Sequence, residues 1–302
     1  MGARGSVGDL GSGGAILPLV PSDRHNGIVS VRRAVILIVA TPCTVLLALW
    51  GGSCALRSWF GPPTVDLKEH YKAGAGTGRF DHAAFTSILA DYVDARGGVD
   101  YAGLRKNSSK LNRYLEQVQK APFEALGRDE KLAFLINAYN AFTLRLILDH
   151  WPVASIRDIP SSERWNAVRW DVGGKKLSLT QIEHEYLRNR FVEPRVHFAI
   201  NCASVGCPPL RRDAYDAKRL EQQLQEQALA MHGDARWLRL EGDVVYLTKL
   251  YEWYAGDFVQ VGGTVLEYAA RFAPALAAAH KQGRRLSISW LDYDWSLNVQ
   301  RK

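Results

Sequence analysis

A short stretch in the second half of the chain carries a thiol, a hydroxyl and an amide within a few residues of one another. It runs from Arg195 to Leu210 and reads R-V-H-F-A-I-N-C-A-S-V-G-C-P-P-L. Large apolar residues at every second position predict a short strand over 196–201. A turn of small residues follows, and Pro208-Pro209 prevents regular structure from continuing. We expect a functional site here, because loops on a rigid scaffold often carry reactive side chains.

Cys202 is the candidate nucleophile of a thiol-dependent hydrolase or acyl transferase, since it lies where the predicted strand ends. A reactive thiolate needs a nearby base, and the base needs an orienting group. We favour His184 over His197 as the base, because an unbroken strand places His197 on the face opposite Cys202. Backbone amides of residues 204–206 could stabilise an oxyanion. The candidates for orienting the imidazole are Asp257, Asp294, Asn137 and Asn140.

The two cysteines also permit other interpretations. Cys202 and Cys207 are the only cysteines after residue 54, and in an oxidising compartment a pair five residues apart could form a disulfide. Together with His184 and His197 they could instead bind zinc, although the spacing is not that of a compact zinc finger. We favour a protein without a metal or other cofactor.

A third class is a non-catalytic envelope domain that binds a small molecule or a peptide. Its wall would consist of aromatic side chains from two C-terminal segments, and buried amides and a hydroxyl would fix the ligand's orientation. Nothing in the sequence marks the substrate as glycan, peptide or lipid. The candidate ligand-binding residues are Trp253, Tyr254, Trp295, Asn137, Asn140, Asn201 and Ser204, with Tyr293 as a further part of the wall.

Periodicity predicts the elements that position these residues. A helix over Asp129–His150 is apolar nearly all round, so Asn137 and Asn140 share a face in a buried setting. A hairpin over 168–179 turns at Gly173-Gly174. A capping box of Thr180 and Glu183 predicts a helix to about Phe191, with His184 among apolar neighbours.

The remaining pattern predicts an α+β fold, a single globular domain with several helices around a small, mainly antiparallel sheet. Further helices are expected at 81–95, 104–119, 216–231, 250–258 and 264–279. Short strands are expected at 99–101 and 291–298, and a second hairpin is expected over 237–248 around Glu241-Gly242-Asp243.

The N-terminal part has a different composition. Residues 1–33 are rich in Gly and Ser and predict disorder, and 34–56 form an uncharged run long enough to span a bilayer. Arg32-Arg33 before the run predicts an extracytoplasmic or periplasmic globular domain, 80–302, behind a linker, 57–79. The run could be a retained anchor, an ordinary signal peptide, or a lipoprotein signal cleaved before Cys54.

Charge argues against a nucleic-acid partner. The chain of 302 residues has a formal net charge of +7 and is 47% hydrophobic. Five Arg against two Asp in the first 63 residues account for +3, which leaves +4 for the long remainder, without a basic stripe.

Five sequence blocks resemble the bacterial and plant family called domain of unknown function 547. The resemblance implies which positions belong together and implies no established reaction. The blocks are F-L-I-N-A-Y-N at 134–140, L-T-Q-I-E-H at 179–184, H-F-A-I-N-C-A-S-V-G-C-P at 197–208, L-Y-E-W-Y-A-G-D-F at 250–258 and L-D-Y-D-W-S-L-N at 291–298.

Overall fold

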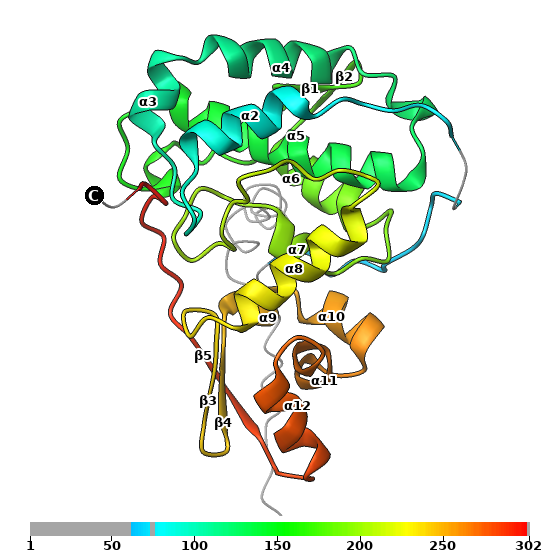
Figure 1. Cartoon of the computed structure of the whole chain (residues 1–302), viewed down its shortest axis with the longest axis vertical. Helices are drawn as coiled ribbons and strands as arrows, with labels where there is room; N and C mark the ends of the chain where they lie inside the picture. The colour runs from blue at the N-terminus through cyan, green and yellow to red at the C-terminus, as the bar shows by residue number, and fades with distance from the viewer. Residues whose placement is uncertain (1–61, 73–75, 301–302) are drawn as a thin grey trace, which may run out of the picture. The chain divides into compact units, whose positions relative to one another are not determined.

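A 22-residue helix, α5 (Arg128–Asp149), runs through the first hydrophobic core, and 17 of its residues are buried. In the computed structural model, which describes residues 62–72 and 76–300, α2, α4 and α6 lie around it (Figure 1). Within those residues α5 is the one helix long and apolar enough to cross a membrane, and 89% of its most apolar window is buried. The expected central helix is confirmed. The predicted disordered and membrane-spanning segments, and residues 57–61 and 73–75 of the predicted linker, lie outside the described residues.

Three helices precede α5: α2 (Ala83–Tyr92), α3 (Tyr101–Lys106) and α4 (Ser109–Gln119). The single helix expected over 104–119 is therefore wrong, because the chain breaks at Asn107-Ser108. The strand expected at 99–101 is also wrong. Asp100 caps α3 by accepting a hydrogen bond from the amide of Gly103 at 2.9 Å, so Tyr101 is already helical. A 3₁₀ turn, η1 (Phe123–Ala125), leads into α5, and another, η2 (Ile156–Asp158), follows it.

The first hairpin is confirmed. Strands β1 (Trp170–Val172) and β2 (Lys175–Leu177) pair antiparallel. The turn residues Gly173 and Gly174 have φ of 55° and 81°, the left-handed conformation that this two-residue turn requires and that glycine adopts without strain.

The segment that carries His184 begins two residues earlier than expected. Ser178 and Gln181 form the capping box, and α6 (Leu179–Gln181) continues into η3 (Ile182–Leu187), a π-helical turn. The amide of Arg188 donates to the carbonyl of Glu183 at 2.9 Å, five residues back. The predicted capping role of Glu183 is wrong, because Gln181 takes that role and the Glu183 carboxylate accepts from two tyrosine hydroxyls. Single π turns inside helices are frequent at functional sites.

The strand expected over 196–201 is a one-turn helix, α7 (Val196–Ala199). The alternation was misleading because both faces are buried: Val196, His197, Phe198, Ala199 and Ile200 are all shielded from solvent. When a segment is buried on every side, its apolar residues do not show whether it follows the two-residue period of a strand or the 3.6-residue period of a helix.

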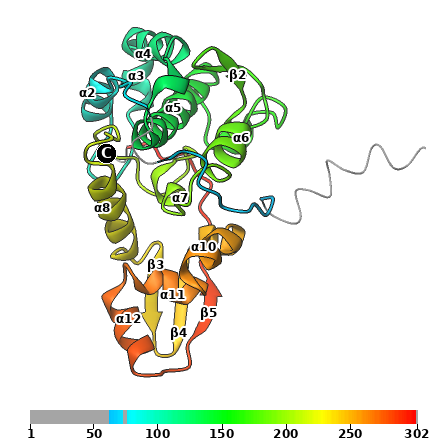
Figure 2. The same cartoon turned by 90° about the vertical axis from the view of Figure 1, so that its right-hand side faces the viewer.

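The C-terminal third begins with α8 (Leu220–His232), close to expectation. The second hairpin is confirmed as β3 (Leu238–Glu241) and β4 (Val244–Leu247), and β5 (Ser287–Trp290) adds to β4 in parallel, which makes a mixed sheet. The strand expected at 291–298 is wrong; this segment is extended but makes only an isolated bridge, Ser204 to Leu297. Figure 2 shows the sheet beside α11 and α12.

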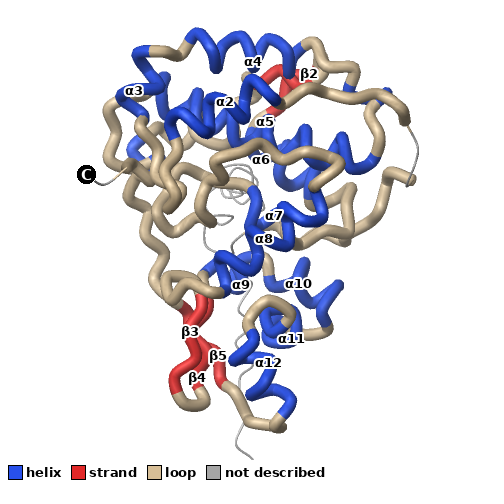
Figure 3. Tube along the Cα trace, in the orientation of Figure 1, coloured by secondary structure: helices blue, strands red, loops and turns tan. Residues whose placement is uncertain are grey.

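The two C-terminal helices expected from periodicity are each divided. The first comprises α9 (Lys249–Trp253) and α10 (Ala255–Gly262). The second comprises α11 (Val265–Ala270) and α12 (Pro274–Lys281), because Pro274 can begin a helix but cannot continue one. The α+β class is confirmed, and Figure 3 shows how few of the described residues are strands. One core surrounds α5; a second, which includes Phe198, fills the space between the sheet and α9–α12.

Candidate functional site

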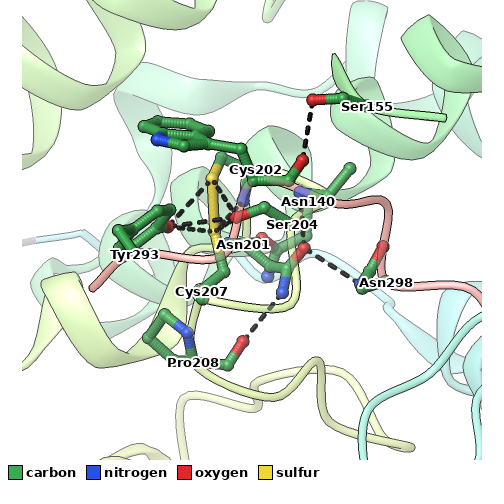
Figure 4. Close-up of a disulfide and its surroundings, with 12 residues drawn as sticks. Asn140, Ser155, Asn201, Cys202, Ser204, Cys207, Pro208, Tyr293 and Asn298 are labelled. Atoms are coloured by element: carbon green, nitrogen blue, oxygen red, sulfur yellow. Dashed lines mark hydrogen bonds between the residues drawn. A yellow bond between two sulfur atoms is a disulfide. The ribbon is translucent and has the colours of Figure 1, made fainter. Parts of the chain in front are cut away.

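The loop after α7 is closed by a disulfide between Cys202 and Cys207, whose Cα atoms are 6.3 Å apart (Figure 4). Of the alternatives expected for the two cysteines, the structure therefore contains the disulfide. Cys207 is buried and Cys202 is half-buried. With both sulfurs bonded to each other, neither is a thiolate, and Cys202 cannot act as a nucleophile in this state.

The loop is held in an unusual backbone conformation. Ala203 has φ of 63°, the one non-glycine residue of the described chain in the left-handed region. The Oδ1 atom of Asn201 accepts a hydrogen bond from the amide of Ala203 at 2.7 Å. Its Nδ2 atom donates to the carbonyl of Pro208 at 2.7 Å (Figure 4). Strained backbone that the surroundings over-determine is typical of functional loops.

Two hydroxyl groups lie against the disulfide. The hydroxyl of Tyr293 is 3.1 Å from the Sγ of Cys207, and the Oγ of Ser204 is 3.3 Å from it. The two hydroxyls are 3.1 Å from each other. Tyr293 comes from the extended segment after β5, so the C-terminal part of the chain completes the site.

A buried charge cluster lies between the two cores. Arg188 donates from Nε and Nη2 to both carboxylate oxygens of Asp257, at 2.7 and 2.9 Å. The Nε2 atom of His197 donates to the same carboxylate at 2.8 Å. Burial acts to raise the pKa of Asp257, but the hydrogen bonds from Arg188 and His197 outweigh it and hold the pKa at about 2. The carboxylate is therefore ionised at neutral pH.

Glu183 is the second buried carboxylate. It accepts hydrogen bonds from the hydroxyls of Tyr254 at 2.5 Å and Tyr139 at 3.3 Å. Burial acts to raise its pKa, but the hydrogen bond from the Tyr254 hydroxyl and the positive charge of Arg188 act in the opposite direction, and the pKa lies below its usual value. Two tyrosine hydroxyls thus satisfy a carboxylate that the sequence alone did not single out as buried.

The hydrogen bonds of His184 leave it without a free basic nitrogen. Its Nδ1 atom accepts from Nη1 of Arg188 at 3.0 Å, and because a guanidinium only donates, the proton of the neutral ring is on Nε2. Burial lowers the pKa of His184, which favours this neutral form. Nε2–H can donate to a ligand but cannot take a proton from a thiol.

His197 is also unsuited to serve Cys202. Its side chain is 1% exposed, burial lowers its pKa, and its ring stacks on Tyr254 at 3.8 Å between centroids. Its Nδ1 atom has no partner among the described residues. The structure places Asp257 within hydrogen-bond distance of His197, which is the arrangement that a carboxylate orienting an imidazole requires. The hydrogen bonds of the Cys202 sulfur, however, go to Ser204 and Tyr293 and not to either histidine.

The three asparagines are used by the protein itself. Asn137 pairs with both backbone groups of Tyr215, at 2.8 and 2.9 Å. Asn140 donates to the carbonyl of Ala199 at 3.0 Å and accepts from the amide of Asn201 at 2.8 Å. These amides hold the loops around the site in place.

The aromatic side chains of the predicted wall do gather in one place. The rings of Trp253, Tyr293 and Trp295 contact one another, with centroids 4.6 to 5.9 Å apart. Trp165 extends the group, 6.1 Å from Trp295. All four are half-buried. Tyr254 is separate from this wall, since it faces Glu183 and His197.

Two arginines flank the wall. The guanidinium of Arg157 lies 5.4 Å from the centroid of Trp295, and that of Arg164 lies 4.9 Å from that of Trp165. Burial lowers the pKa of Arg164, and the positive charge of Arg157 lowers it further. Among the described residues neither arginine has a carboxylate within ion-pair distance. The wall therefore combines flat apolar rings with two positive charges that form no ion pair, although the charge of Asp158 acts on Arg164.

Asp294 does not orient a histidine. It is exposed, and its carboxylate accepts hydrogen bonds from the amide of Ser296 at 2.9 Å and from its hydroxyl at 2.5 Å. It lines an open cleft of about 860 Å³ on the Cys207 side of the loop. The zinc hypothesis is wrong: both cysteines are in the disulfide, and no group of three metal-ligating side chains occurs in the described part of the chain.

Arg188 is the residue that sequence reasoning missed most clearly. It is 2% exposed, and a buried arginine requires a carboxylate partner. The available signal was Asp257 in an aromatic segment, because a carboxylate buried there requires a cationic partner.

Comparison with known proteins adds one finding. Residues 123–230 match the profile of a family described as a protein of unknown function, DUF547. No curated protein and no solved structure matches the chain. The resemblance is thereby confirmed over the region from η1 through α8, which includes the disulfide loop. The blocks at 250–258 and 291–298 lie outside the matched region.

Proposed function

We propose that this chain is an exported, membrane-tethered domain that binds a small molecule or a peptide on the wall formed by Trp165, Trp253, Tyr293 and Trp295. The observation that carries the proposal is the contact between this half-buried wall and two arginines without carboxylate partners. Aromatic side chains supply large contact areas, and a guanidinium fixes the position of an anionic group. The ligand class is therefore a flat or apolar group that carries a negative charge.

The sequence supports the tether and the compartment. The uncharged run over 34–56 follows Arg32-Arg33, and this charge bias favours a globular part outside the cytoplasm. A disulfide in the domain is consistent with an oxidising compartment. Residues 34–56 lie outside the described part of the chain.

A thiol-dependent hydrolase is less well supported. It requires Cys202 to be reduced and a histidine with a free basic nitrogen beside it. In the structure Cys202 is in a disulfide, Nδ1 of His184 accepts from Arg188, and His197 is buried against Asp257. The asparagines proposed to orient an imidazole bind backbone groups instead.

Titration calorimetry of the full-length protein in nanodiscs tests the proposal. The probe is 2-naphthalenesulfonate, with neutral 2-naphthol as the uncharged comparison and empty nanodiscs as the blank. We expect saturable binding of the sulfonate, weakened about tenfold by Trp295→Ala or by Arg157→Ala, which each remove one contact worth on the order of 1–2 kcal/mol. Arg285→Ala, at an exposed position, is the matched control.

Three outcomes would contradict the proposal: no saturable binding, equal binding of sulfonate and naphthol, or binding that Trp295→Ala leaves unchanged. Hydrolysis of an activated ester such as p-nitrophenyl acetate, seen only after reduction and lost in Cys202→Ser, would instead support the thiol hydrolase.

A further inference from the structure

The two sulfurs of the disulfide have different surroundings. Cys207 is 4% exposed, and its Sγ atom is the acceptor for three donors: the amide of Cys202 at 2.9 Å, the hydroxyl of Tyr293 at 3.1 Å and that of Ser204 at 3.3 Å. Cys202 as a residue is half-buried, and the contacts of its Sγ atom with the same hydroxyls are 3.3 and 3.4 Å long. Cys202 is thus the more exposed of the two cysteines, and the sulfur of Cys207 has more and closer donors.

We propose that this disulfide is a site of thiol–disulfide exchange with a fixed direction, in which a thiolate attacks Cys202 and Cys207 leaves. The incoming sulfur forms a bond to Sγ of Cys202, and the Cys202–Cys207 bond breaks with its electron pair going to Cys207. The reductant is a dithiol. The second thiolate of the dithiol then attacks the dithiol's first sulfur, which is bonded to Cys202 in the mixed disulfide. That bond breaks, and Cys202 leaves as a thiolate. The dithiol is oxidised to a disulfide, and its two protons end on Cys202 and Cys207.

The donors explain why Cys207 is the leaving group. A thiol of lower pKa leaves faster, and hydrogen bonds to the anion lower a thiol's pKa. Burial alone would work against a thiolate at Cys207, so the three donors are what stabilise the charge. Burial raises the pKa of the Tyr293 hydroxyl, and the charge of Glu183 acts in the same direction, so Tyr293 keeps its proton and remains a donor at neutral pH.

The surrounding backbone keeps the donors in place when the bond is broken. The amide of Val205 donates to the carbonyl of Ser296 at 2.9 Å, and that of Gly206 donates to the carbonyl of Asp294 at 2.8 Å. The amide of Asn298 donates to the carbonyl of Ala203 at 3.1 Å. These bonds join the loop to the C-terminal segment independently of the sulfurs, so exchange does not require the domain to unfold. The inference does not depend on ligand binding at the aromatic wall.

The direction of exchange is tested by mapping a mixed disulfide. The oxidised full-length protein, with Cys43→Ser and Cys54→Ser so that only the two loop cysteines react, is mixed with reduced glutathione, quenched in acid and digested. We expect mass spectrometry to find glutathione on Cys202 and a free thiol on Cys207. Glutathione mainly on Cys207, or divided equally, would overturn the proposal.

The role of the donors is tested by the rate of reduction by excess dithiothreitol. Tyr293→Phe removes the hydroxyl and keeps the ring contacts, and we expect it to slow reduction about tenfold, since a charge-assisted hydrogen bond is lost. Ser204→Ala should act in the same direction. Tyr246→Phe, on β4, is the control and should leave the rate unchanged.

An unchanged rate in Tyr293→Phe and Ser204→Ala, with folding verified by circular dichroism, would overturn the role of the donors. Reduction only at urea concentrations that unfold the domain would overturn the exchange site itself. If Tyr293→Phe does not fold, Ser204→Ala and the glutathione mapping still decide.

Discussion

Arg188 and Asp257 form a doubly hydrogen-bonded ion pair in which the side chains are 2% and 1% exposed. Arg188 follows the π-helical turn η3, and Asp257 lies on α10, so the pair joins segments that belong to the two cores. The guanidinium also lies over the ring of Tyr254, 4.9 Å from its centroid. Two charges buried this deeply are tolerated only because each satisfies the other.

Arg188→Met should destabilise the domain by about 3–5 kcal/mol, because it leaves the Asp257 carboxylate buried without its main partner. The measurement is the free energy of unfolding from urea titration. Arg145→Met is the matched control: Arg145 pairs with Asp149 on the more exposed side of α5, and its loss should cost less than about 1 kcal/mol. Similar losses in the two variants would show that the buried pair has no special structural role.

The same pair predicts an acid dependence. The folded-state pKa of Asp257 is about 2, below the usual value near 4, so its contribution is present above the unfolded pKa and is lost as the pH falls towards about 2. The stability difference between the native protein and Asp257→Asn should therefore shrink between about pH 4 and about pH 2. A difference that stays constant over this range would contradict the ionised, hydrogen-bonded carboxylate.

His232 predicts a second pH dependence, at higher pH. Its Nδ1–H donates to the carbonyl of Ala228, and its Nε2 accepts from the hydroxyl of Tyr251, both at 2.6 Å, so the ring is neutral. Burial lowers its pKa to about 4, although the hydrogen bond to Ala228 acts in the opposite direction. The unfolded chain therefore binds a proton that the folded one does not between about pH 6.5 and 4, and stability falls as the pH falls through this window.

The measurement is the stability difference between the native protein and His232→Gln as a function of pH. It should decrease by about 3 kcal/mol from pH 7 to pH 4. His280→Gln, on the exposed side of α12, is the control for removing an imidazole. A difference for His232→Gln that does not change with pH would mean that the ring is not buried as a neutral group.

The sequence predicted best where a local rule determines the structure. Gly173-Gly174 indicates a hairpin because only glycine takes two successive left-handed residues without strain, and the hairpin is present. The apolar run of α5 indicates a buried helix whatever surrounds it. The disulfide was one of three alternatives left open for Cys202 and Cys207, because spacing alone does not decide between a bridge, free thiols and metal ligands.

The rest depends on tertiary contacts that no local pattern reports. The burial of α7 on every side made a helical turn resemble an alternating strand. Glu183 resembled a capping residue but binds Tyr139 and Tyr254, which are far from it in sequence. The burial of Arg188 is explained only by its hydrogen-bonded ion pair with Asp257, which is 69 residues away in sequence.

Asn140 predicts a structural effect without a loss of binding. Asn140→Ala leaves the carbonyl of Ala199 and the amide of Asn201 buried and unpaired, which should cost about 2–3 kcal/mol of unfolding free energy. Its affinity for 2-naphthalenesulfonate should stay within about twofold of the native value below the unfolding temperature, because both amide atoms bind backbone groups and not the aromatic wall. Asn189→Ala, at an exposed position, is the control. A large loss of affinity with unchanged stability would instead make Asn140 a ligand-binding residue.

Removing the disulfide should weaken the domain without unfolding it. The bridge joins residues five apart, and closing so short a loop stabilises by about 2 kcal/mol through the entropy of the unfolded chain. Reduction, or Cys202→Ser with Cys207→Ser, should therefore lower the unfolding free energy by that amount in urea titration. The far-ultraviolet circular dichroism should be retained, because the hydrogen bonds of Val205, Gly206 and Asn298 hold the loop against the C-terminal segment. Collapse of the native spectrum on reduction would show that the bridge, and not these backbone bonds, holds the loop in place.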